Sequence, residues 1–334
     1  MKEQQLPAVT HPLVGMEGLR VYHAEFRLRA RQPLGFGPQP GAQIRGAIYN
    51  ALSAQNCPID APPHPRGQSD ECPVCYLLAR EDAQAERGRD VPRPLIIEPP
   101  LGLRELQPGE PFVFGLKLVG PRAATAFPLI ATAVEHAASE GFGRGRGLAA
   151  LESVRAASAD GGWINLSAAE SLGADRVALS TEWVLRRAAS LDPTRIGIRF
   201  LTPLALKVAK QTLRVPQLGP LVRRIHERCQ VLAECYAEPV ADAELPPVEA
   251  WRMRYLQLGA LAEAAERVRC DTRWVDVRSG SAVKGHWTPI SGLVGEAEWR
   301  GQLGPLLPWL VWGELVHAGK NVTKGGGWLR VNSA

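Results

Sequence analysis

The chain has 334 residues, and its 45% hydrophobic and 22% charged composition is that of an ordinary globular protein. This composition excludes disordered, collagenous and coiled-coil proteins, and no apolar run of about 18 residues is long enough to span a membrane. The net charge of +5, with Arg far outnumbering Lys, permits a nucleic-acid partner without proving one. The first 20 residues contain no apolar segment typical of a secretory signal, so we expect a cytoplasmic protein with reduced thiols.

The first half of the chain alternates between strand and helix patterns. Leu19 to Ala30 alternates in polarity and predicts a strand, whereas the apolar stripe between Gly41 and Ala54 predicts a helix. Three further strands and one helix follow, over Leu95–Ile97, Phe112–Leu118, Phe127–Ser139 (the helix) and Leu148–Val154. The order strand, helix, strand, strand, helix, strand is that of a ferredoxin-like unit.

An irregular segment from Cys57 to Arg93 interrupts this unit and contains a CxxC pair. Cys57, His64, Cys72 and Cys75 are a workable tetrahedral ligand set for a structural zinc ion. The alternative is that the CxxC opens a helix and buries two ordinary thiols.

The second half shows a similar order of predicted strands and helices after a linker predicted at residues 156–178. Its predicted strands are Arg195–Phe200, Arg269–Val277, Ile290–Trp299 and Trp328–Val331, and its predicted helices are Leu218–Leu232, Trp251–Val268 and Leu306–Leu315. Both halves end with a helix, a glycine-rich basic loop and a strand, which indicates an internal duplication. We therefore predict an α+β protein of two tandem ferredoxin-like (βαββαβ) domains. The first spans 1–160 with a cysteine insert at 55–93, and the second spans 175–334 with a glycine-rich loop at 319–327.

The two glycine-rich loops, Gly141–Gly147 and Gly319–Gly327, do not fit nucleotide-binding motifs. Each follows a helix and precedes a strand, which is the reverse of a Rossmann turn. Their glycines allow close backbone approach, and Arg144, Arg146, Lys320 and Lys324 add positive charge. Such loops suit a sugar–phosphate chain, although a tight turn with solvated charges remains the alternative.

Several segments together resemble the CRISPR repeat-processing endoribonucleases of the RAMP superfamily. Residues 313–328 resemble the family's glycine-rich signature, and the segments Gly41–Ala47, Phe200–Lys207 and Gly292–Gly295 are similar to further parts of it. The resemblance implies two ferredoxin-like domains side by side and CRISPR repeat RNA as the substrate, with other CRISPR effector subunits as partners. It also implies a reaction that needs no catalytic cofactor. A ribose 2′-hydroxyl attacks the adjacent phosphate, leaving a 2′,3′-cyclic phosphate and a 5′-hydroxyl.

The resemblance also directs attention to particular catalytic candidates. Many members carry a general-base His on the first helix, but Gly41–Ala54 has none, so Tyr49 is the candidate there. The alternative for Tyr49 is a ring that packs at the domain edge. His317 suits proton transfer and Lys320 suits stabilisation of the phosphate, whereas His23 on the first strand is expected to be structural.

Candidate contacts to the RNA backbone are Arg45, Arg144, Arg146, Lys207, Lys210, Lys324 and Arg330. The missing helix histidine favours a second hypothesis, in which the protein binds a repeat or guide RNA within an effector complex without cutting it. A third hypothesis, from another class, is a zinc-stabilised interaction protein that has no role with RNA.

Overall fold

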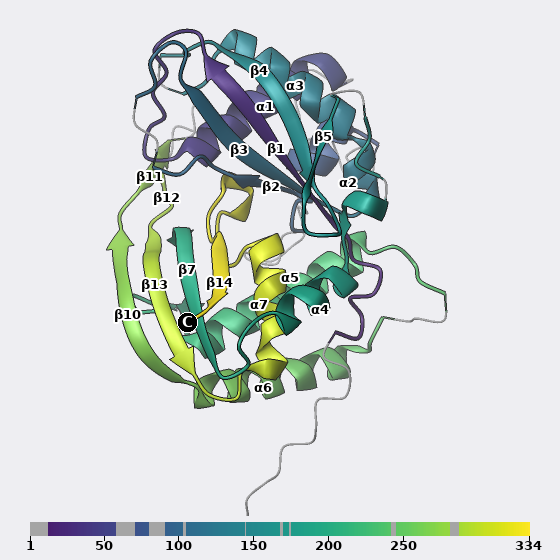
Figure 1. The fold of residues 1–334 in the computed structure, drawn as a ribbon, viewed down its shortest axis with the longest axis vertical. Coiled ribbons are helices and arrows are strands. Elements are labelled where there is room, and N and C mark those ends of the chain that lie inside the picture. The colour runs from purple at the N-terminus through teal and green to yellow at the C-terminus, as the bar shows by residue number, and fades with distance from the viewer. Residues whose placement is uncertain are drawn as a thin grey trace, which may run out of the picture.

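The computed structural model describes residues 13–57, 71–79, 91–102, 105–143, 145–167, 170–173, 175–241, 245–280 and 287–334. Within these ranges the chain forms two large antiparallel sheets, one above the other in Figure 1. No helix in the described part of the chain combines the length and the apolar character that crossing a membrane requires.

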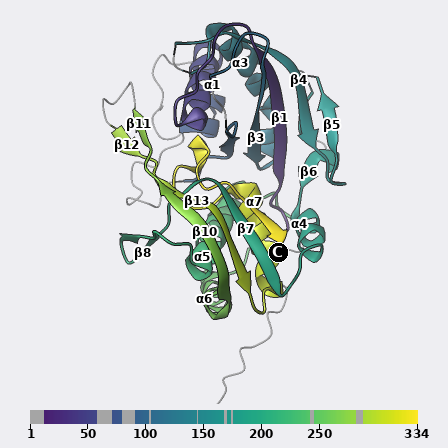
Figure 2. The same ribbon diagram turned by 60° about the vertical axis from the view of Figure 1, so that its left-hand side comes forward.

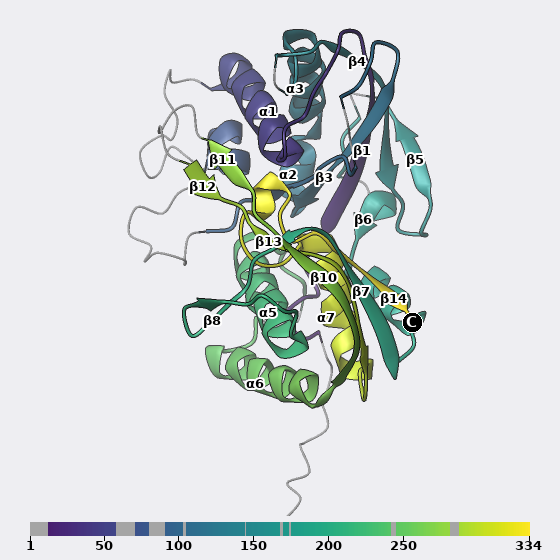
Figure 3. The same ribbon diagram turned by 90° about the vertical axis from the view of Figure 1, so that its left-hand side faces the viewer.

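The first sheet has the strand order β2-β3-β1-β4-β5, and β6 pairs with one end of β1. Its strands are β1 (Val21–Ala30), β2 (Leu95–Glu98), β3 (Pro111–Val119), β4 (Ala149–Ala157), β5 (Trp163–Leu166) and β6 (Ala178–Leu179). The helices α1 (Pro40–Asn56) and α3 (Phe127–Glu140) pack side by side on one face, and the short α2 (Pro121–Thr125) precedes α3 (Figure 3). Alternate side chains of β1 are buried beneath these helices, where Phe26 stacks on Phe114 at a centroid distance of 5.3 Å.

The second sheet has the order β10-β13-β7-β14. Its strands are β7 (Arg195–Leu204), β10 (Glu266–Val275), β13 (Gly292–Arg300) and β14 (Leu329–Ser333). Helices α5 (Leu218–Tyr236), α6 (Val248–Ala264) and α7 (Leu307–Val316) lie on one side of it, and α4 (Thr181–Ala189) packs on α7 (Figure 2). Two small hairpins project from this half, β8–β9 (Lys207–Val208 and Gln211–Thr212) and β11–β12 (Arg278–Gly280 and Trp287–Pro289).

Both sheets place the first strand of their unit beside the third, with the second and fourth strands flanking them. This is the order that a βαββαβ chain takes when both helices cross the same face of the sheet. The predicted class, an α+β protein of tandem ferredoxin-like units, is therefore confirmed. The boundaries 1–160 and 175–334 stay a prediction.

Three predictions about individual segments are wrong. Residues 156–178 are not a plain linker, because they contain β5, which pairs with β4, and the first residue of β6, which pairs with β1. The helix predicted to reach Val268 ends at Ala264, since Ala265 is extended and Glu266 already pairs with Arg300. The strand predicted to end at Phe200 continues to Leu204, where it pairs with Leu293.

The sheet faces that the helices leave uncovered carry paired charges. On the first sheet Arg27 and Arg29 both contact Glu152, and Arg155 contacts Glu25. On the second sheet Arg195 and Arg269 share the carboxylate of Glu298. Exposed pairs of this kind contribute little to stability.

Candidate nucleic-acid interface

The glycine-rich loop of the second half packs directly against the first helix. The loop contains the short 3₁₀ turn η4 (Val322–Lys324), which contacts both α1 and β2. A Cβ atom on Gly41 would collide with the carbonyl oxygen of Lys324, and a Cβ on Gly325 would lie 2.7 Å from Cδ of Pro99. Glycine at these two positions therefore permits the close contact between the two halves.

The backbone of this loop is largely bonded to the protein itself. The N–H groups of Lys324 and Gly326 donate to the carbonyl of Asn321 at 2.9 and 3.0 Å, and Gly327 donates to Pro203 at 3.0 Å. Asn321 and Gly325 have left-handed φ angles of 60° and 85°, which close the turn. A phosphate approaching this part of the loop would thus meet side chains rather than a row of free N–H groups.

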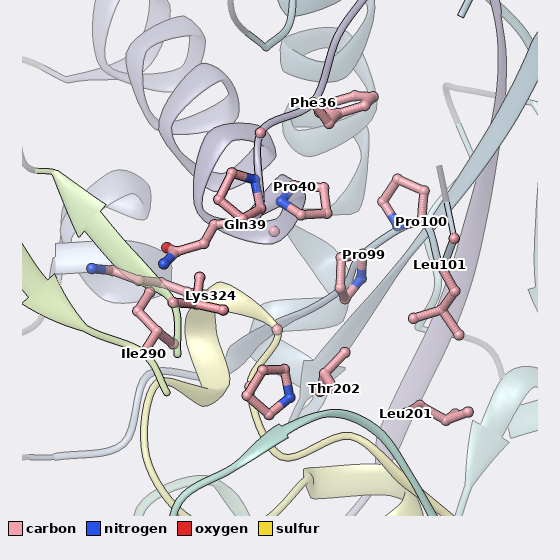
Figure 4. A pocket seen from close by; sticks show the side chains of 18 residues that line it. Phe36, Gln39, Pro40, Pro99, Pro100, Leu101, Leu201, Thr202, Ile290 and Lys324 are labelled. Atoms are coloured by element: carbon pink, nitrogen blue, oxygen red, sulfur yellow. The ribbon is translucent and has the colours of Figure 1, made fainter. Parts of the chain in front are cut away.

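A junction cleft of about 260 Å³ opens where the loop meets the first half (Figure 4). Its walls come from four segments and two single residues, namely Phe36–Gly41, Pro99–Gly102, Leu201–Pro203, Lys324–Gly326, Val277 and Ile290. Lys324 is the charged residue among them. Figure 4 shows the side chains of Gln39 and Lys324 extending in the same direction from neighbouring parts of this wall.

Two polar groups in the junction cleft lack their usual surroundings. The amide oxygen and nitrogen of Gln39 are both buried and have no hydrogen-bond partner within the described residues. Burial and the nearby charge of Arg45 lower the pKa of Lys324. A buried amide without partners costs free energy that a bound polar ligand would recover, so the junction cleft is a candidate binding site.

The three predicted catalytic side chains lie in different surroundings. Tyr49 is half-buried on α1 near Cys75 and Arg45, and burial raises the pKa of its phenol, which disfavours a phenolate base. His317 is fully buried at the end of α7, and this burial lowers its pKa to about 4. Lys320 is largely exposed, and partial burial of its amine together with the nearby cations Lys207 and Arg224 lowers its pKa. Their catalytic roles stay predictions.

Some of the predicted RNA-binding side chains are bonded within the protein, and others are exposed to solvent. Arg45 donates to the carbonyl of Leu78 at 2.7 Å, and Arg146 contacts Glu140 at 3.0 Å. Lys207 and Lys210 are exposed on the β8–β9 hairpin, and Lys207 lines a cavity that Lys320 also lines. Arg330 is exposed on β14, with its guanidinium 6.0 Å from the ring centroid of Trp328. Arg144 lies outside the described residues.

The predicted zinc set is not supported. Cys57 and Cys72 have their sulfur atoms 4.0 Å apart, and Cys75 is buried in the short π-helix η1 (Cys75–Ala79). His64 lies outside the described residues, and within the described ones no three His, Cys, Asp or Glu side chains gather as a metal site.

The sequence did not reveal a buried charged cluster between the two halves. Glu98 at the end of β2 contacts Lys117 of β3 and, at 2.7 Å, Nε2 of His23 on β1. Lys117 also donates to the carbonyl of Glu314 on α7 at 2.7 Å, and Nε2 of His317 lies 3.7 Å from Glu98. Burial opposes ionisation of Glu98, but His23 and Lys117 outweigh it and hold its pKa well below the usual value. The available sequence signal was a charged residue next to or within an apolar strand, namely Glu98 at the end of β2 and Lys117 inside β3.

The contact between α1 and the loop yields a prediction with an internal control. Gly41→Ala should lower the free energy of unfolding by about 1–3 kcal/mol, because the helix or the loop must shift to admit the methyl group. Gly46→Ala, on the same helix, meets no atom within 4 Å and should raise stability by up to about 1 kcal/mol through helix propensity. Urea unfolding of both variants measures the difference, and equal effects would contradict the packing of loop against helix.

Comparisons with known proteins fit this architecture. Residues 198–329 match the family model of CRISPR-associated endoribonuclease Cas6, and residues 19–177 match a family model described as an N-terminal domain. A search of curated proteins found no match.

Solved structures show the same fold at low sequence identity. A chain of a partial Cas6-RT-Cas1–Cas2 complex superposes with a TM-score of 0.60 at 16% identity, covering 95% of this chain and 46% of that one. A Cas6 product complex gives 0.56 at 17% identity, with 93% and 99% covered. A Thermus thermophilus Cas6 gives 0.52 at 17% identity, with 94% and 98% covered. This chain thus spans less than half the length of the first of these proteins. It spans 29% of the matched chain in a second structure, of the Cas6-RT-Cas1–Cas2 complex. Together these comparisons show that residues 198–329 match the CRISPR-associated endoribonuclease Cas6 family, and that most of the chain shares the fold of solved Cas6 structures.

Proposed function

We propose that the chain is a metal-independent endoribonuclease that cuts CRISPR precursor RNA within its repeats. The observation that carries the proposal is the junction cleft, where the Cas6-type glycine-rich loop meets α1 and sets Lys324 beside the unpartnered amide of Gln39. The match of residues 198–329 to the Cas6 family supports RNA as the substrate.

The reaction needs a base near the 2′-oxygen, positive charge at the phosphate and a proton donor for the leaving 5′-oxygen. Lys324 suits the last two tasks, since its ammonium is cationic and its lowered pKa eases proton donation. Arg45 lies close enough to lower that pKa further. The Gln39 amide, if its side chain turns toward the cleft, can hydrogen-bond a ribose hydroxyl or a phosphate oxygen and so orient the strand. Tyr49, His317 and Lys320 remain the proposed proton-transfer and phosphate-stabilising residues from the sequence.

A second function is favoured by one specific observation. Within the described residues α1 carries no His, and the imidazoles of His226 and His317 are buried. Without a histidine on α1 to act as base, the protein would bind repeat RNA and cut it slowly or not at all. In that case the chain would hold a repeat or guide RNA within a larger CRISPR complex.

Incubation of the purified protein with end-labelled repeat RNA in EDTA separates these functions. The proposal predicts cleavage at one position, with a 2′,3′-cyclic phosphate on the upstream product and a 5′-hydroxyl on the downstream one. Intact RNA across cognate repeats, together with binding that weakens steeply as salt rises, would refute the nuclease and establish the binding subunit. Absence of both cleavage and salt-sensitive binding would leave the third hypothesis, an interaction protein.

A further inference from the structure

A second hollow between the two halves is lined by three tryptophan side chains. This tryptophan pocket of about 340 Å³ lies among β5, α4, α7 and β14, and its aromatic residues are Trp163, Trp183 and Trp328. Volumes of this size, about 300 Å³ and above, are those in which small ligands bind. The junction cleft contains none of these residues, so the tryptophan pocket is a separate site.

The tryptophan rings are held in defined positions by their neighbours. The guanidinium of Arg155 lies 4.3 Å from the ring centroid of Trp163, and the ring of His23 meets Trp163 edge-on at 5.2 Å. The ring of His317 lies parallel to Trp328, with a centroid distance of 6.0 Å and an interplanar angle of 5°. Trp163 is nevertheless 41% exposed, so a ligand can reach it from solvent.

The charges that line the tryptophan pocket leave a positive excess. Lys117, Arg187 and Arg330 are cationic, and Glu98 and Glu314 are their acidic counterparts. Glu98 is engaged by Lys117 and His23, and Glu314 accepts the backbone N–H of Val331 at 2.7 Å. The pocket therefore suits a ligand that combines a planar ring with one negative charge.

We propose that the tryptophan pocket binds one unpaired ribonucleotide of the RNA strand, with its base stacked on tryptophan and its phosphate near Arg330. The inference rests on the proposed function, since it takes RNA as the bound strand. Aromatic side chains bind single-stranded bases of any sequence by stacking, and a nearby cation neutralises the backbone. Continuity of the chain supports this occupant, because Gly325 and Gly326 line the junction cleft and Trp328 to Arg330 line the tryptophan pocket.

The test is a fluorescence titration of the whole protein with the five-residue oligonucleotide rA5 and with an abasic strand of equal length. Stacking on tryptophan should quench the intrinsic fluorescence with rA5 and not with the abasic strand. Trp163→Ala should weaken rA5 binding by at least about fivefold. Trp274→Ala is the matched control, because Trp274 also stacks under an arginine, Arg214 at 3.9 Å, but lies on β10 outside the pocket. This control should bind rA5 like the parent protein.

The pocket assignment is overturned if Trp163→Ala binds rA5 as tightly as the parent protein, or if the abasic strand quenches equally. Circular dichroism and unfolding of Trp163→Ala confirm that the variant is folded, and Trp163→Phe, which retains a stacking ring, should recover most of the affinity. Failure here differs from failure of the proposed nuclease. If Trp163→Ala binds repeat RNA with unchanged affinity and cuts it at the normal rate, the pocket assignment is refuted and the nuclease proposal stands. If quenching depends on the bases but repeat RNA is not cleaved, the nuclease proposal is refuted and the pocket assignment stands.

Discussion

Replacement of Lys117 by methionine should lower the free energy of unfolding by about 3–5 kcal/mol, because it leaves the Glu98 carboxylate buried without its cation. Lys117 and Glu98 are almost fully buried, and the Lys117 ammonium also donates to the carbonyl of Glu314 on α7. The cost should therefore include weaker contact between the first sheet and the second half. Denaturant or thermal unfolding measures it.

Two companion variants define the source of this loss. The double change Lys117→Met with Glu98→Gln removes both charges and should recover a substantial part of the stability. Arg300→Met breaks the exposed pair with Glu266, whose side chains are 64% and 62% exposed, and should cost less than about 1 kcal/mol. A Lys117→Met variant as stable as Arg300→Met would show that the buried cluster contributes nothing to joining the halves.

The same cluster predicts how stability depends on pH. The pKa of Glu98 is lowered in the folded protein, so its contribution is fully present above the unfolded-state value of about 4.3. It is lost as pH falls through the folded-state value. The buried His317 and His226, each with a pKa lowered to about 4, act in the same direction below about pH 6.5, because unfolding lets them bind protons. Acid should therefore destabilise the parent protein more than the double variant.

Removal of the Lys324 side chain should have the largest effect on RNA cleavage. Lys324→Ala deletes the charged residue of the junction cleft, and loss of one group that stabilises developing charge typically costs about 10²–10³-fold in rate. RNA binding should weaken far less, because Lys207, Lys210 and Arg330 remain exposed. Single-turnover cleavage and equilibrium binding of the same repeat RNA separate the two effects. Lys324→Arg, which keeps a cation, should recover part of the rate.

The control for this prediction is Arg300→Ala, an exposed cation at the far end of β13 from the junction cleft. β13 begins at Gly292, two residues after the cleft residue Ile290, and runs nine residues to Arg300, or about 30 Å at 3.4 Å per residue. Arg300→Ala should cleave like the parent protein. Equal cleavage rates for Lys324→Ala and the parent protein would show that cleavage does not take place at the junction cleft.

Segments with strong local periodicity were predictable from the sequence. The stripe of Ile44, Ile48 and Leu52 is buried on α1 as expected, because one face of a helix must meet the sheet. Exposed elements were harder to predict. β10 is exposed along most of its length, so it lacks the alternation that marks a half-buried strand, and its first residues were assigned to the preceding helix. β5, a four-residue edge strand, and the nine-residue α4 were missed because short elements carry weak patterns.

The candidate site was predictable only in part for a related reason. The glycine-rich loop could be recognised from its local sequence, and this recognition identified Lys320 and Lys324 as candidates. The residues that contact this loop could not be predicted from the sequence. Gln39, Pro99 and Lys324 come from three distant segments that meet only in the folded protein. The same applies to Glu98, Lys117 and His317. A single sequence shows that each is polar and does not show that tertiary packing brings them together.

We expect RNA to be held where the glycine-rich loop of the second half meets the first helix. Photo-crosslinking of the parent protein to repeat RNA that carries 4-thiouridine, followed by mass spectrometry of the crosslinked peptides, tests it most directly. We expect crosslinks within residues 36–45 and 320–330. Crosslinks confined to the exposed strand β10 or to α6, with none in those two segments, would contradict the claim.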